Sequence, residues 1–164
     1  MAGLPDWAAS FLAQRRIATL GTLDEDGSPH LTPVWFLFRE QQFFVGCASS
    51  SRKARNAAAR PTASLLVDTR TAGAERWVSG AGPVTILRGN EARPIVAAIQ
   101  ERYLTAEALR DPRIGPGFAA ADDIALWIRP AQWRSWAAAD LDAQFFGGVL
   151  TKEPKKWFRP LDPS

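Results

Sequence analysis

Histidine and cysteine are almost missing from this chain. Its 164 residues include one histidine, His30, and one cysteine, Cys47. A lone cysteine cannot form a disulfide within the chain, and one cysteine with one histidine cannot build a Cys/His zinc cluster. His30 follows a Gly-Ser-Pro turn and is interpreted as a turn-edge side chain, and Cys47 as a small buried apolar residue. We therefore predict no metal site.

Long apolar runs and the common phosphate-binding motifs are missing as well. No uninterrupted apolar stretch reaches the roughly 18 residues that a membrane helix needs. Asp6 precedes the first apolar stretch and Arg15–Arg16 follow it, the reverse of a secretory signal. There is no G-x-x-x-x-G-K-[ST] loop and no G-x-G-x-x-G after a strand. The sequence thus predicts a soluble, cytoplasmic protein without a membrane partner and without a classical nucleotide-binding fold.

The excess of positive charge is small. Twenty Lys and Arg residues against 17 Asp and Glu give a net charge of +3, too little to indicate nucleic-acid binding. We expect no nucleic-acid partner, although a small nucleic-acid-binding barrel with salt-sensitive affinity stays an alternative. The composition, 46% hydrophobic and 23% charged, is that of one globular domain.

The hydrophobic pattern predicts α+β organisation. We expect one domain over 1–164: an N-terminal helix within 1–14, a barrel with inserted helices over 15–137, and a C-terminal tail over 138–164 that lacks hydrophobic periodicity. Asp24-Glu25-Asp26-Gly27 and the polar residues 39–42 are typical of hairpin turns. Gly80 and Gly82 are expected at bulges or bends. About six to seven strands then form a small antiparallel barrel with flanking helices. The predicted strands are 17–23, 29–38, 43–47, 63–68, 77–87, 124–128 and 133–136, and the clearest helices 52–59 and 90–103.

One segment carries a possible anion site. Ser49-Ser50-Ser51 place hydroxyl groups and free backbone N–H groups at the start of the helix 52–59, whose first turn holds Arg52 and Lys53. Cations at that end oppose the helix dipole, so a bound phosphate would explain them. The alternative is a capped, solvated surface helix. Both interpretations are open from these residues alone.

A second segment offers a surface for a planar ligand. The stretch 32–38 is apolar and aromatic but contains Pro33, which favours an edge or an irregular point in a sheet. Seven tryptophans in the chain, among them Trp35, Trp77, Trp133 and Trp136, favour a flat ligand or a subunit interface. The alternative is that these aromatic residues form ordinary core.

The order of these segments resembles a known superfamily. ATLGTLDEDGSPHLTPVWFLF, FFVG, SSSRKARN, RPTASLLVD and ERWVSGAGPVTIL follow one another as in the pyridoxamine 5'-phosphate oxidase-like split barrels, near the members that use the deazaflavin coenzyme F-420. The resemblance covers residues 15–88 well. It implies a six- to seven-stranded antiparallel split β-barrel of the FMN-binding kind, with flanking helices, in a homodimer with cofactor sites at the interface.

The resemblance also assigns site residues. The phosphate of F-420 or FMN would lie against the helix start, the ring along the second strand, and backbone contacts would come from the segment before the helix. Residues near Trp77 and Ser79, or from the final WRSW segment, would reach the partner's cofactor. In that order the implied cofactor-binding residues are Ser51, Arg52 and Lys53; Pro33, Val34, Trp35 and Phe36; Cys47, Ser49 and Ser50; and Trp77 and Ser79.

The implied function is hydride transfer between F-420 or FMN and a small organic substrate, since the cofactor carries this chemistry. No residue compels assignment as a catalytic acid or base. Residues 31–36 carry no charge, unlike the basic strand of true pyridoxamine phosphate oxidases, so that activity is not implied. The alternative function is non-catalytic binding or sensing of FMN or haem by the same fold.

Overall fold

The chain folds into one curled antiparallel sheet with helices at its edges. The structure, a computed structural model, describes residues 3–160. The first two residues of the predicted N-terminal segment and the last four of the predicted tail lie outside this range. The strands are β1 (Ala18–Leu23), β2 (Pro29–Val34), β3 (Leu37–Arg39), β4 (Gln42–Ala48), β5 (Thr62–Thr69), β6 (Arg76–Leu87), β7 (Asp123–Ile128) and β8 (Gln132–Ala137). The helices are α1 (Asp6–Ala13), α2 (Arg52–Ala59), α3 (Gly89–Tyr103), α4 (Ala106–Arg110), α5 (Gly115–Ala119), α6 (Ala138–Phe146), α7 (Val149–Lys152) and α8 (Pro154–Trp157).

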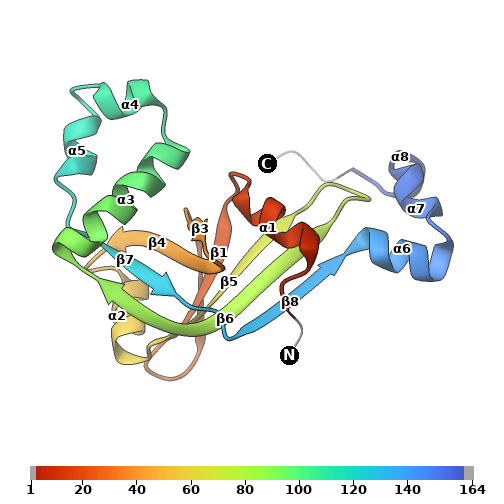
Figure 1. The fold of residues 1–164 in the computed structure, drawn as a ribbon, viewed down its shortest axis with the longest axis horizontal. Helices are drawn as coiled ribbons and strands as arrows, with labels where there is room; N and C mark the ends of the chain where they lie inside the picture. Colours follow the sequence, from red (N-terminus) through yellow and green to blue (C-terminus); the bar gives the residue numbers. More distant parts are fainter. Residues whose placement is uncertain (1–2, 161–164) are drawn as a thin grey trace.

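Strand β6 joins the two halves of the sheet. The strand order is β2-β1-β5-β6-β7-β4-β3, and β8 pairs with β6 beside this path. The first half of β6, from Arg76 to Ala81, pairs with β8, whereas residues 84–87 pair with β7. One long strand therefore belongs to both halves of the sheet, which curls around it (Figure 1). This architecture confirms the predicted α+β split barrel.

Gly82 lies where the chain between β7 and β8 passes closest to β6. The corner between β7 and β8 crosses the strand here: the amide of Arg129 donates to the carbonyl of Pro83 at 3.0 Å, and that of Ala131 to Ala81 at 2.9 Å. A Cβ atom on Gly82 would lie 2.1 Å from the Arg129 carbonyl oxygen. Only glycine fits such a close backbone approach. The pairing of β6 with β5 continues through Gly80 and Gly82 without an extra residue, so neither glycine forms a bulge on that side.

The core lies inside the curl. Alternate residues of β1 and β5 point inward, as the period of two for a half-buried strand requires. Helix α1 closes one side by burying Phe11 and Leu12 completely. The largest fully buried side chains are Phe11, Phe36, Phe43, Leu12, Leu20, Leu65, Ile124, Leu126 and Ile128.

The predicted strand 29–38 is wrong at its end, because the structure divides it into two. Strand β2 stops at Val34, and β3 begins at Leu37. Between them Phe36 turns into the core with no exposed surface, and Trp35 stacks on Tyr103. Phe36 is thus buried and Trp35 half-buried at the point where the strand is interrupted. The edge position of β2 matches the expectation from Pro33.

The C-terminal segment differs from the prediction because it is helical. Residues 138–157 form α6, α7 and α8, joined through Gly147 and Gly148, which both adopt left-handed backbone. The buried carboxylate of Asp142 accepts hydrogen bonds from the amides of Leu150 (3.1 Å) and Thr151 (2.7 Å) and so caps α7. Such a cap, made by a residue of the preceding helix, leaves no hydrophobic period in the sequence. Across residues 3–160 the structure contains no helix with the length and apolar character of a membrane span.

Candidate functional site

A cavity of about 450 Å³ opens between the end of β2, strand β4 and helices α2, α3 and α5. Its wall is mostly apolar, with polar groups near the start of α2 and the start of β7. The lining residues are Ile17, Pro33, Val34, Trp35, Gly46, Cys47, Ala48, Ser51, Lys53, Val96, Ile99, Gln100, Phe118 and Asp123. A pocket with apolar walls and a few polar groups is the usual form of a small-molecule site.

Helix α2 supplies the positive end of this cavity. Ser51 is the N-cap of the helix, and its Oγ accepts a hydrogen bond from the amide of Ala54 at 3.4 Å. Half-buried Lys53 lines the cavity and forms no ion pair within residues 3–160. A helix start with free N–H groups and a lysine is suited to an anion such as phosphate.

The thiol of Cys47 lies beside this helix start. Burial raises the pKa of Cys47, although Ser51 and Lys53 act in the opposite direction. The residue therefore stays a neutral thiol at neutral pH and contributes shape, not charge, to the cavity.

Trp35 contributes an aromatic side chain to the wall. Its ring stacks on Tyr103 of α3, with 5.1 Å between centroids and 1° between planes. The Tyr103 hydroxyl is itself fixed, because it donates to the carbonyl of Arg16 at 2.5 Å. The tryptophan is thus held in one orientation at the edge of the cavity, as a planar ligand would need.

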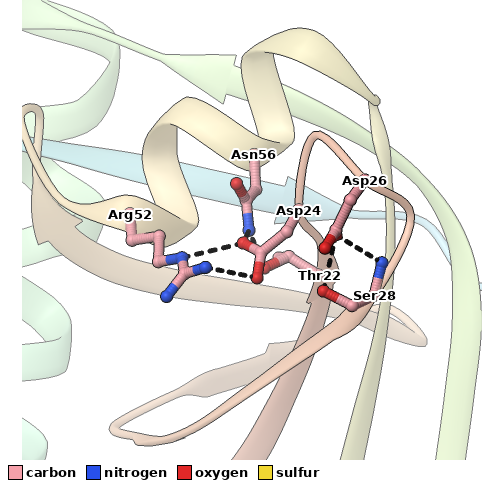
Figure 2. Close-up of polar contacts among 6 residues, drawn as sticks. All are labelled: Thr22, Asp24, Asp26, Ser28, Arg52 and Asn56. Atoms are coloured by element: carbon pink, nitrogen blue, oxygen red, sulfur yellow. Dashed lines mark hydrogen bonds and ion pairs between the residues drawn. The ribbon is translucent and has the colours of Figure 1, made fainter.

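Arg52 does not line the cavity. Its guanidinium instead binds Asp24 on the β1–β2 hairpin (Figure 2). Its Nε lies 2.8 Å and its Nη2 2.6 Å from the two carboxylate oxygens. Asn56, one turn further along α2, donates through Nδ2 to Asp24 at 2.8 Å and to the Thr22 hydroxyl at 3.1 Å. These hydrogen bonds, from Asn56 first and then from Arg52, hold the pKa of Asp24 below its ordinary value.

The serines before Ser51 also have structural partners. The hydroxyl of Ser49 hydrogen-bonds the carboxylate of Asp122, and the Ser50 carbonyl accepts from Arg55 at 2.5 Å. Neither serine lines the cavity.

The structure therefore brings together half of the predicted cofactor-binding residues. Pro33, Val34, Trp35, Cys47, Ser51 and Lys53 line the cavity. Of the other six, Ser49, Ser50 and Arg52 have the partners given above. Phe36 is buried in the core against Phe43, and Trp77 and Ser79 lie on β6, where they pair with β8.

Sequence reasoning did not assign the opposite wall of the cavity. Val96, Ile99 and Gln100 come from α3 and Phe118 from α5, far from α2 along the chain. Asp123 begins β7, and burial together with neighbouring Asp122 raises its pKa. Helical spacing places Val96, Ile99 and Gln100 on one face of α3, but nothing in that spacing shows what the face covers. Within residues 3–160, no three His, Cys, Asp or Glu side chains gather in a group able to hold a metal.

The curled sheet and flanking helices define a split barrel of the α+β class. Residues 4–137 match the pyridoxamine 5'-phosphate oxidase family. A biliverdin reductase of Mycobacterium tuberculosis that depends on reduced F-420 is 35% identical over 115 residues, which are 69% of this chain and 77% of that protein. The chain therefore belongs to the pyridoxamine 5'-phosphate oxidase family. At the level of the family, these similarities support a flavin- or deazaflavin-binding oxidoreductase.

Solved structures agree with this assignment. A conserved hypothetical protein of Mycobacterium tuberculosis superposes with a TM-score of 0.69 at 26% identity, covering 86% of this chain and 89% of that chain. An F-420 reductase gives a TM-score of 0.63 at 21% identity, with coverage of 79% and 98%. The haem storage protein of Vibrio cholerae gives 0.62 at 18% identity, with coverage of 83% and 95%. The last two similarities concern the fold alone.

Proposed function

We propose that this protein binds F-420 or FMN in the cavity of about 450 Å³ beside α2 and transfers a hydride between that cofactor and a small organic substrate. The observation that carries the proposal is the meeting of Lys53, Ser51 and Trp35 around one cavity. These residues come from separate segments, and together they offer a cation, a helix start and an aromatic wall.

The phosphate would lie at the start of α2. Lys53 has no protein partner among residues 3–160 and is free to pair with an anion, and the first-turn amides of the helix add N–H donors. Arg52, by contrast, is held by Asp24 at 2.6–2.8 Å. We therefore assign the direct contact to Lys53 and Ser51, and to Arg52 the role of fixing α2 on the β1–β2 hairpin.

The ring would lie against Pro33, Val34 and Trp35. When bound, F-420 or FMN supplies the hydride chemistry. The chain's part is to orient the ring through Trp35 and to exclude water with the apolar side chains of α3 and α5. We assign no proton donor for this reaction.

The active form in this proposal is a homodimer. Trp77 and Ser79 lie outside the cavity of their own chain, so any contact with a cofactor would be made across a subunit interface. Exposed apolar side chains such as Leu31 (65% exposed) and Phe145 (65% exposed) offer surface for subunit contact.

F-420 is favoured over FMN by the 35% identical reductase, which uses the reduced form of that cofactor. For haem, the residues fit less well. His30, the one histidine of the chain, lies on β2 and is not among the residues that line the cavity, so a haem there would have no histidine ligand from this chain.

Parallel titrations with F-420, FMN and riboflavin, followed by a turnover assay, test the proposal. Riboflavin is the matched control because it has the ring of FMN without the phosphate. We expect micromolar or tighter binding of F-420 or FMN, at least tenfold weaker binding of riboflavin than of FMN, and oxidation of the reduced cofactor by electron-poor alkenes, quinones or biliverdin. Failure of both cofactors to bind would overturn the proposal, and tight binding without any turnover would favour the storage alternative.

A further inference from the structure

A second cavity, of about 550 Å³, lies on another side of the barrel and shares no lining residue with the first. It is formed by α1, the loop between β5 and β6, the start of β6 and the start of α6. Figure 1 shows α1 beside the sheet in the region where β5, β6 and β8 run together. The lining residues are Trp7, Arg16, Thr69, Thr71, Gly73, Ala74, Arg76, Ala137, Ala139 and Asp140.

Two arginines meet on one aromatic ring in this cavity. The guanidinium carbon of Arg16 lies 4.5 Å from the centroid of Phe11, and that of Arg76 lies 4.8 Å from the same centroid. Arg76 also lies 5.5 Å from the ring of Trp7. Phe11 has no exposed surface, so the two cations cover a buried ring and are themselves half-buried. Burial, together with the charge of Arg76, lowers the pKa of Arg16.

No carboxylate lies within ion-pair distance of either arginine in residues 3–160, although the charge of Asp68 acts on Arg16 from further away and raises its pKa in part. Neither arginine forms an ion pair there, and the carboxylate of nearby Asp68 is bound to Arg70 at 3.0 Å. Arg16 donates only to neutral oxygens, the Gln14 side chain at 2.6 and 3.2 Å and the Asp68 carbonyl at 3.4 Å. Arg76 donates no side-chain hydrogen bond to residues 3–160. Asp140, an exposed residue of α6, is the one carboxylate in the lining, beyond ion-pair distance of both.

From this arrangement we propose a second ligand site, in which Arg16 and Arg76 bind an oxyanion, a phosphate or carboxylate group of a small molecule. Two half-buried cations without a direct ion-pair partner repel one another, and a bound oxyanion offsets that repulsion. The hydrogen bonds to Gln14 and Asp68 leave Arg16 one N–H on each terminal nitrogen, and Arg76 keeps all of its N–H groups. Such N–H groups match the geometry of carboxylate and phosphate oxygens. The hydroxyls of Thr69 and Thr71, 3.4 Å apart, stand on the same wall and add neutral donors.

The site is independent of the proposed cofactor cavity. The two cavities have no residue in common, and Lys53, the free cation of the first, does not line the second. A ligand here would be a second anionic molecule, such as a charged substrate or effector, in addition to the cofactor.

The test follows the arginine side chains directly by NMR. The Nε–Hε signals of Arg16 and Arg76 are recorded during titration of the cofactor-free protein with inorganic phosphate, with succinate as a dicarboxylate, and with chloride at matched ionic strength. We expect saturable shifts of both signals with phosphate, succinate or both, and none with chloride. The probe that binds identifies the oxyanion class, whereas shifts that follow ionic strength alone, or no shift at all, would overturn the proposal.

Variants test whether the probe binds through the arginines that line this cavity. Arg76→Gln should weaken binding of the probe at least tenfold, and Arg113→Gln, whose side chain pairs with Asp111 and does not line the cavity, should leave it unchanged. Lys53→Ala should also leave it unchanged, which distinguishes the two sites. If Arg76→Gln fails to fold, Arg76→Lys keeps the charge over Phe11 but not the planar fork, and it should still weaken binding several-fold. Equal affinity in Arg76→Lys and the unchanged protein would contradict a guanidinium site.

Discussion

Arg52 and Asp24 form a two-point ion pair, at 2.8 and 2.6 Å, that joins the first turn of α2 to the β1–β2 hairpin. The sequence places Arg52 beside Lys53, and the two cations were expected to act together on a phosphate. The structure gives them different neighbours, because successive residues of a helix point about 100° apart. Lys53 lines the cavity, and Arg52 anchors the helix that carries it.

Asn56→Ala should lower the free energy of unfolding by about 1–3 kcal/mol, the usual cost of leaving buried polar partners unsatisfied. Asn56 is buried and donates hydrogen bonds to both the Asp24 carboxylate and the hydroxyl of Thr22, a residue that is 2% exposed. Chemical denaturation of Asn56→Ala and Arg52→Ala side by side checks this. Arg52 is 59% exposed in its side chain, so its loss should matter less. A larger effect of Arg52→Ala would contradict the assigned roles.

Stability should fall in acid partly through Asp24. The hydrogen bonds from Asn56 and Arg52 lower its pKa in the folded protein below the ordinary value of 3.8. The unfolded chain therefore binds the proton more readily, and the stabilisation is present above pH 3.8 and is lost as the pH falls through the lower, folded-state pKa. Unfolding curves between neutral and strongly acidic pH should show a shallower decline for Asp24→Asn. An unchanged slope would remove Asp24 from the acid response.

Gly82→Ala should destabilise the barrel strongly, by about 3 kcal/mol or more, since a backbone clash at the corner has no flexible side chain to yield. The added Cβ would lie 2.1 Å from the Arg129 carbonyl oxygen. Gly46→Ala is the matched control: its Cβ would meet Val96 and Ile99 at 3.7 and 3.8 Å, ordinary contacts. Because these contacts are ordinary, Gly46→Ala should fold. Because Gly46 lines the cavity, the added methyl group should weaken binding of the cofactor. Thermal melts of both variants decide the point, and similar melting temperatures would refute the close-approach account.

Replacing Trp35 should change the absorption and fluorescence of bound F-420 or FMN. The ring of Trp35 is fixed by its stack on Tyr103 and lines the cavity. A cofactor ring in contact with this indole would have its absorption and fluorescence altered by it. Spectra of the complexes with Trp35→Leu and with Trp157→Leu, an exposed residue of α8, provide the comparison. Identical spectra for Trp35→Leu and the unchanged protein would move the ring away from this wall.

Local signals in the sequence predict most of the strands and the first turn of α2. The Asp-Gly turn, the serine cap and the strand at 63–68 each depend on neighbours within a few residues, and the structure confirms them. The break between Val34 and Leu37 was missed because it results from contacts with Tyr103 and Phe43, which lie far along the chain or on another strand.

For the same reason, the sequence assigned residues on the α2 side of the candidate cavity but none on the side formed by α3 and α5. Ser51 and Lys53 belong to a recognisable helix start, but α3 and α5 reach the cavity through the fold. The helical C-terminal segment escaped prediction because Asp142 caps α7 from the preceding helix, and two glycines interrupt any period.

The most direct test of the central claim is the affinity of F-420 and FMN for Lys53→Ala, measured by equilibrium titration beside Lys152→Ala. Lys152 lies on α7 and does not line the cavity, so Lys152→Ala removes the same charge away from the proposed site. Loss of a charge-assisted contact of about 1.5–3 kcal/mol should weaken binding of the preferred cofactor by roughly 10- to 100-fold in Lys53→Ala and leave Lys152→Ala unchanged. Equal affinities in the two variants would place the phosphate elsewhere and contradict the proposed site.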